Sequence, residues 1–243
     1  MTQTQVKNNG IFVFDLDRNL VLHRPMMPYI CKKSKENILI YMVTTTFVII
    51  ISLLSIFALK NQEIKSQFML YPYYFWKQKE YYQIITSWII HADEWHLFLN
   101  MYTLWIFGTQ LELWFSHIYS NGSAYFILLF FWAIIASNLF DIFINNDDPD
   151  YATLWSSWAT SAVIFASIVI FPMDKIGLIF FPVMIPGWLF GWLYLAYCMY
   201  KDYQDNDNIN HMAHFIGGIF WIVFMLLTWP ETLSNFAYQI HAG

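Results

Sequence analysis

Long blocks of apolar residues, separated by short polar segments, dominate the chain from about residue 38 onwards. Each block is close to the roughly 20 residues that an α-helix needs to cross the hydrocarbon core of a bilayer. The pattern therefore predicts an all-α, polytopic membrane protein, a bundle of six transmembrane helices over 38–59, 95–115, 124–144, 154–171, 176–200 and 210–229. Because Pro182 and Pro186 interrupt the fifth block and proline lacks a backbone N–H, we expect its regular helix to begin near Pro186.

The composition supports a membrane environment. Charged residues make up only 12% of the chain, whereas soluble domains carry about 25%, so the chain has too few ionic groups to cover a soluble surface. The net charge of −5 argues against a nucleic-acid partner. We expect a cytoplasmic N-terminal segment (1–36), a six-helix membrane domain (37–230) and a short C-terminal tail (231–243).

The distribution of basic residues predicts the orientation. Lysine and arginine accumulate on the cytoplasmic side of membrane proteins, and a basic cluster precedes the first block: Lys7, Arg18, Arg24, Lys32, Lys33 and Lys35. The loop at 145–153 is acidic, which suits an outer loop. The sequence therefore predicts a multi-pass protein of the cell membrane with both termini in the cytoplasm.

Polar residues gather near one end of three of these helices. In the predicted topology the second, fourth and sixth helices run in the same direction, so their N-terminal thirds lie at one depth. Those thirds carry His91, His96 and Asn100, then Ser156, Ser157, Thr160 and Ser161, then Asn210, His211 and His214. Polar groups at membrane depth are costly and usually face a bundle interior or a wet cavity.

A hydroxyl and an imidazole at one depth suggest a nucleophile and its general base, because serine needs a base within hydrogen-bond reach. His96 and Asn100 are four residues apart on one helical face and could donate to a developing oxyanion. Two other interpretations stay open. Hydroxyls in membrane helices more often stabilise helix packing, and the spacings of His91 with His96 and of His211 with His214 allow a remote alternative, a histidine-ligated metal site.

Two stretches resemble the rhomboid family of intramembrane serine proteases. One is His91-x4-His96-x3-Asn100, which continues to Gly108 and Glu112; the other, Ala213-His214-x-x-Gly217, is similar to the A-H-x-x-G motif of the sixth rhomboid helix. The similarity in order and spacing extends over about 38–229. It implies a six-helix rhomboid-like bundle, transmembrane proteins as substrates, the lipid bilayer as surroundings, and neither cofactor nor metal.

The resemblance also implies roles for individual residues. His214 would be the general base of a Ser–His dyad, and His96 and Asn100 would stabilise the oxyanion. His91 and His211 would support the site without reacting.

The nucleophile follows from the alignment of the fourth helix with the rhomboid pattern G-x-S-G-A. Taken with the run from Ser161 to Ala166, the pattern places Ser157 at the nucleophile and puts Trp155 and Trp158 where rhomboids have glycines. An alternative register makes Thr160 the nucleophile.

Two functions follow from these residues. The first is a serine protease that cleaves transmembrane segments near the extracytoplasmic face. The second is a catalytically impaired, rhomboid-like pseudoprotease that binds such segments without cutting. The second arises because two indoles beside Ser157 add bulk that a packed core absorbs only with strain, and a misplacement of about 1 Å can cost about a hundredfold in rate.

Overall fold

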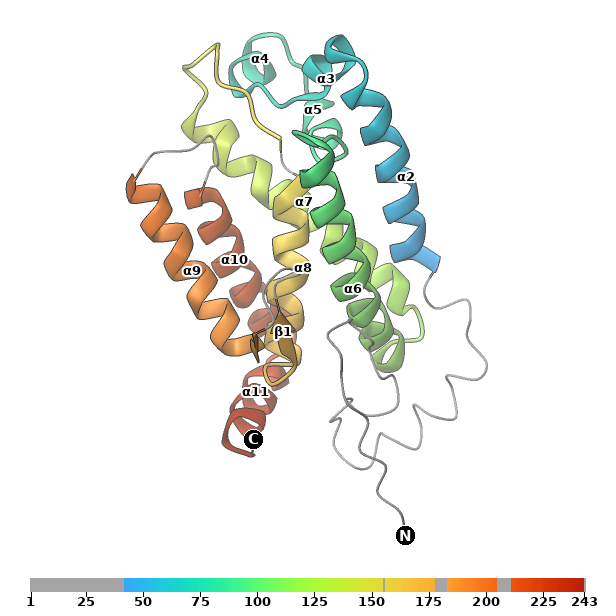
Figure 1. Ribbon diagram of the computed structural model, residues 1–243, viewed down its shortest axis with the longest axis vertical. Helices are drawn as coiled ribbons and strands as arrows, with labels where there is room; N and C mark the ends of the chain where they lie inside the picture. Colours follow the sequence, from blue (N-terminus) through green and yellow to red (C-terminus); the bar gives the residue numbers. More distant parts are fainter. Residues whose placement is uncertain (1–41, 155, 178–182, 205–210, 243) are drawn as a thin grey trace.

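The computed structural model describes residues 42–154, 156–177, 183–204 and 211–242, and the predicted segment 1–36 lies outside them (Figure 1). The bundle is built from α2 (Met42–Leu59), α6 (Glu94–Ile118), α7 (Gly122–Ile144), α8 (Ser156–Ile170), α9 (Gly187–Gln204) and α10 (His211–Thr228). Three short helices connect α2 to α6: α3 (Gln62–Phe68), α4 (Pro72–Lys77) and α5 (Gln83–Thr86). α11 (Glu231–Ala242) follows α10 and occupies the predicted C-terminal tail.

The helices follow the predicted apolar blocks closely, with one difference. Where the hydropathy pattern begins the fifth span, the chain instead forms two paired antiparallel strands, β1 (Lys175–Gly177) and β2 (Met184–Pro186). α9 then begins at Gly187, directly after Pro186, where the sequence places the start of the regular helix. Hydropathy alone misses the hairpin because a short apolar strand and an apolar helix end have the same composition.

The helical architecture agrees with an all-α class apart from this hairpin. Within the described residues, α7 is the one helix both long and apolar enough to cross a membrane. α10 and α11 together reach that length only if they are counted as one span despite the 109° bend between them. α2 and α8 are apolar but shorter. The bundle is therefore established, whereas the count of six spans stays a prediction.

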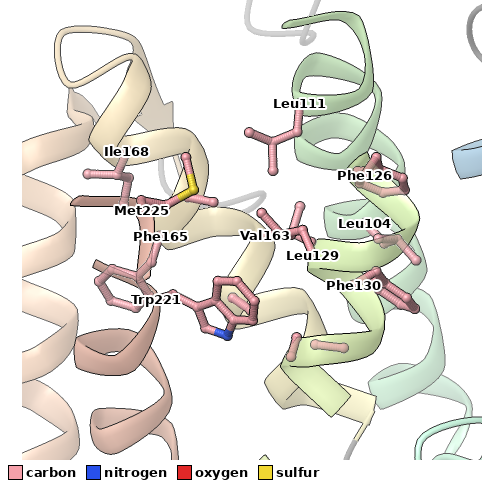
Figure 2. Packing of buried hydrophobic residues seen from close by; sticks show 14 of the residues in the cluster. Leu104, Leu111, Phe126, Leu129, Phe130, Val163, Phe165, Ile168, Trp221 and Met225 are labelled. Carbon is pink, nitrogen blue, oxygen red and sulfur yellow. The ribbon is translucent and has the colours of Figure 1, made fainter. Parts of the chain in front are cut away.

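α8 lies at the centre of the bundle, where it packs against α6, α7, α9 and α10. Figure 2 shows Val163 of α8 beside Leu129 of α7, and Phe165 of α8 beside Trp221 of α10. All four side chains are at most 2% exposed. Thr160, Ser161 and Ser167, polar residues of α8 whose side chains the structure describes, are all buried. Buried polar groups usually have a hydrogen-bond partner.

The connecting segment between α2 and α6 is fixed to α7 by side-chain hydrogen bonds. Asn138 is fully buried, accepts a bond from the Ser87 hydroxyl at 3.3 Å and donates to the Ile84 carbonyl at 3.2 Å. The Asp93 side chain then caps α6 by accepting from the His96 backbone N–H at 2.7 Å, a common start for a helix. These contacts place His91 and His96 at the entry of α6.

Candidate active site

α6, α8 and α10 run in the same direction, away from the end of the bundle that carries α3 to α5 (Figure 1). The topology predicted from the sequence has the second, fourth and sixth apolar blocks running in the same direction. It brings the polar residues near the start of these three helices into one region, and the hydrogen bonds between the helices show which of them meet.

The central contact joins α8 to α10. Ser161 Oγ lies 3.4 Å from His214 Nδ1, and Ser161 is only 5% exposed. The distance is longer than an optimal hydrogen bond, as is common for a nucleophile and its base before substrate binds. A serine hydroxyl and an imidazole nitrogen therefore meet inside the bundle at a separation that suits a catalytic dyad.

Gly218, one turn after His214, allows α10 to approach α8 this closely. A Cβ atom at Gly218 would lie 2.7 Å from Phe165 Cε2 and 3.0 Å from Leu195 Cδ2. Because real Cβ atoms essentially never come within 3.0 Å of another side chain, any larger residue here has to shift its neighbours. The glycine thus controls the spacing between the helices that carry Ser161 and His214.

The two nucleophile candidates from the sequence have different places. Ser157 belongs to α8, four residues before Ser161 and therefore about 6 Å nearer the helix start; its side chain, like those of Trp155 and Trp158, lies outside the described residues. Thr160, the alternative nucleophile, donates its hydroxyl to Asn100 Oδ1 at 3.1 Å.

Asn100 and His96 face this region from α6. Asn100 is 7% exposed, and its bond from Thr160 identifies Oδ1 as the accepting end of the amide, so the NH2 group is its donor. The Ala92 N–H donates to His96 Nδ1 at 3.4 Å. A neutral imidazole that accepts at Nδ1 carries its proton on Nε2. Both side chains therefore offer an N–H group, as oxyanion stabilisation requires.

His91 is fully buried in the turn before α6. Its Nδ1 lies 3.0 Å from Ser55 Oγ of α2, and its ring meets the His96 ring edge-on with centroids 5.3 Å apart. Burial, followed by the nearby His96, lowers the pKa of His91 to about 3. His91 is therefore a neutral support that ties α2 to His96.

His211 opens α10 one turn before His214. It is 5% exposed, and its ring meets that of Tyr197 edge-on, with centroids 5.8 Å apart. The backbone N–H of Met212 donates to Asp202 Oδ1 at 3.1 Å, which ties the start of α10 to the end of α9. His211 thus belongs to the junction of α9 and α10.

The sequence suggested no role for two residues of this site. They are Ser161, which contacts His214, and Tyr194. The Tyr194 hydroxyl of α9 lies 3.2 Å from His214 Nδ1. A signal for Ser161 exists in the sequence, because the register that makes it the nucleophile places Ala159 and Ala162 at the glycine positions of G-x-S-G. Tyr194 lies in an apolar, aromatic run without any motif, so no sequence signal distinguishes it.

Metal binding finds no support in the part of the chain that the structure describes. There, no three histidine, cysteine, aspartate or glutamate side chains are grouped as metal ligands are.

Comparison with known protein families identifies the class of protein. Residues 78–231, well over half of the chain, match the Rhomboid domain. The chain therefore belongs to the rhomboid family, whose members are generally intramembrane serine proteases, and its family places it in a membrane. No curated protein and no solved structure matches the chain significantly.

Proposed function

We propose that this protein is an active intramembrane serine protease that cleaves transmembrane segments with a Ser161–His214 dyad. The observation that carries the proposal is the 3.4 Å approach of Ser161 Oγ, on the central helix α8, to His214 Nδ1 on α10. Family membership supports the reaction class. The predicted orientation, with the N-terminus in the cytoplasm of a multi-pass cell-membrane protein, puts the dyad near the extracytoplasmic face.

We assign the nucleophile to Ser161 in preference to Ser157. With Ser161 in that role, Ala159 and Ala162 stand at the motif's two glycine positions and are 2% and 0% exposed. Small residues there suit close packing of membrane helices. The tryptophans then lie outside the motif, and the reason to suspect an impaired pseudoprotease disappears.

The reaction proceeds by acyl transfer. Ser161 Oγ attacks the carbonyl carbon of the scissile bond while His214 takes the hydroxyl proton. The oxyanion receives hydrogen bonds from the Asn100 amide and His96 Nε2–H. The C–N bond breaks as His214 returns the proton to the leaving amine. A water molecule, deprotonated by His214, then hydrolyses the acyl-enzyme and restores the Ser161 hydroxyl.

A serine-directed fluorophosphonate tests the assignment, with the adduct located by mass spectrometry. We expect adduct on Ser161, no labelling of Ser161→Ala or His214→Ala, and retained labelling of Ser157→Ala. An adduct on Ser157 would return the nucleophile to the first register. Absence of labelling in every well-folded, serine-retaining form would favour the pseudoprotease.

A double variant tests the role of the tryptophans. If Ser161 is the nucleophile, replacing Trp155 and Trp158 by glycine should leave the labelling rate of the folded protein within about twofold of the wild-type rate. A large gain would show that indole bulk limits the site and would support Ser157.

A further inference from the structure

The Tyr194 hydroxyl and the Ser161 hydroxyl approach the same nitrogen. Tyr194 OH lies 3.2 Å and Ser161 Oγ lies 3.4 Å from His214 Nδ1. A ring nitrogen of neutral histidine carries either one lone pair or one proton. In either tautomer, Nδ1 therefore makes one good hydrogen bond and serves only one of the two hydroxyls well.

The phenol is favoured in this competition because its oxygen is the closer of the two to Nδ1, at 3.2 Å against 3.4 Å for Ser161 Oγ. In the tautomer whose lone pair is on Nδ1, the acceptor that must take the Ser161 proton is therefore shared with the closer Tyr194 hydroxyl.

The position of Tyr194 is fixed by its aromatic neighbours. Phe190, one turn earlier on α9, stacks on the Tyr194 ring with centroids 6.1 Å apart, and Phe165 of α8 lies at 5.9 Å. The His214 ring meets the tyrosine ring edge-on at 86°. The phenol is therefore held against the dyad by packing that does not depend on its hydroxyl, so a phenylalanine can occupy the same place.

From this geometry we infer that Tyr194 restrains the dyad by competing with Ser161 for His214 Nδ1. The restraint ends when the phenol leaves the nitrogen, either by rotation of its side chain or by displacement of α9. α9 lies at the edge of the bundle (Figure 1) and exposes large side chains such as Trp192 and Leu193, 67% and 54% exposed. This inference rests on the proposed function, because it assumes that Ser161 is the nucleophile.

The test compares Tyr194→Phe with the wild type and with Tyr200→Phe. Tyr200 is an exposed residue of the same helix whose hydroxyl bonds Gln204, so its variant controls for loss of a phenol. We expect Tyr194→Phe to raise the rate of fluorophosphonate labelling of Ser161 about tenfold, the value of one hydrogen bond. On a cleaved substrate, kcat rises while KM stays within twofold. Tyr200→Phe leaves both unchanged.

A second measurement reports the contact without requiring activity. In protein labelled with 15N-histidine, the imidazole nitrogen resonance of His214, assigned through His214→Gln, should shift in Tyr194→Phe and stay unchanged in Tyr200→Phe.

The outcomes separate the two proposals. A shifted resonance together with faster labelling supports the restraint. An unshifted resonance, or labelling of Tyr194→Phe that is unchanged or slower while Ser161→Ala still abolishes it, overturns the restraint and leaves the protease assignment standing. No labelling in any folded form, Tyr194→Phe included, overturns the protease assignment and the restraint with it.

Discussion

Glu112 of α6 holds the start of α2 through Thr44, whose backbone N–H and hydroxyl both donate to Glu112 Oε2, at 3.0 Å and 2.7 Å. The other carboxylate oxygen accepts from the Val43 N–H at 3.3 Å and from the Ser123 hydroxyl of α7 at 2.9 Å. Glu112 and Thr44 are fully buried. One carboxylate therefore joins three helices at the end of the bundle opposite α3 to α5 (Figure 1).

Replacing Glu112 by glutamine should destabilise the bundle strongly. A glutamine has one accepting oxygen, and its NH2 group would face hydroxyl and amide donors inside the protein. Unsatisfied buried donors cost about 1–3 kcal/mol each, so we expect a total loss of about 3 kcal/mol. Thermal unfolding in detergent measures it. The matched control is Glu94→Gln, at an exposed position of the same helix; equal effects of the two changes would contradict the role of the cluster.

Adding a methyl group at Gly218 should separate the dyad. In Gly218→Ala the new Cβ overlaps Phe165 and Leu195, which costs about 1–3 kcal/mol and displaces α10 from α8. The labelling rate of Ser161 should fall by about tenfold to a hundredfold. Gly191→Ala is the control, because its Cβ would meet ordinary contacts of 3.4 Å and longer.

The same mechanism predicts a rescue. Phe165→Leu introduced together with Gly218→Ala removes the ring that the new methyl group would meet. We expect the double variant to regain a substantial part of the labelling rate. If it labels no faster than Gly218→Ala alone, the loss does not arise from steric overlap with Phe165.

Thr160 should act on the reaction through Asn100. Thr160→Val keeps the shape of the side chain but removes the hydroxyl that donates to Asn100 Oδ1. The amide then loses a hydrogen bond that helps to orient it, and we expect labelling of Ser161 to slow by about tenfold, the value of one hydrogen bond. Asn100→Ala, which removes the amide itself, should slow it by about a hundredfold or more.

A control on α6 separates this effect from general loss of a threonine hydroxyl. Thr109 donates its hydroxyl to carbonyls of its own helix, those of Trp105 and Ile106. Thr109→Val should leave labelling unchanged. A Thr160→Val enzyme as fast as the wild type would show that Thr160 does not position Asn100.

His91 should make the protein sensitive to acid. Its pKa is about 3 in the folded protein and about 6.5 in an unfolded chain. Below about pH 6.5 the unfolded chain therefore binds more protons, so this contribution to stability is present above pH 6.5 and is lost as the pH falls towards 3. The replacement His91→Asn, which does not titrate, should flatten the dependence of unfolding temperature on pH between 6.5 and 3. Parallel curves for wild type and variant would contradict the role of His91 in acid sensitivity.

The positions of the helices along the chain were predictable from the sequence, because burial in lipid requires long apolar runs. Runs such as 122–144 must be apolar and helical to satisfy their backbone groups without water, so hydropathy locates them. The motif residues His96, Asn100 and His214 were identified by their spacing along the chain, and their catalytic roles stay predictions. The hairpin before Gly187 was not predictable, because its strands are three residues long and have no distinct pattern.

The sequence by itself determined the class of protein, the helices and the set of polar groups. It did not show that the Ser161 hydroxyl faces His214. Ser157 and Ser161 are four residues apart and share one helical face, so no periodicity can separate them. The docking of α8 against α10, spaced by Gly218, brings Ser161 to the imidazole. The same docking brings Tyr194 from α9 to that nitrogen, a contact between helices that a linear pattern does not encode.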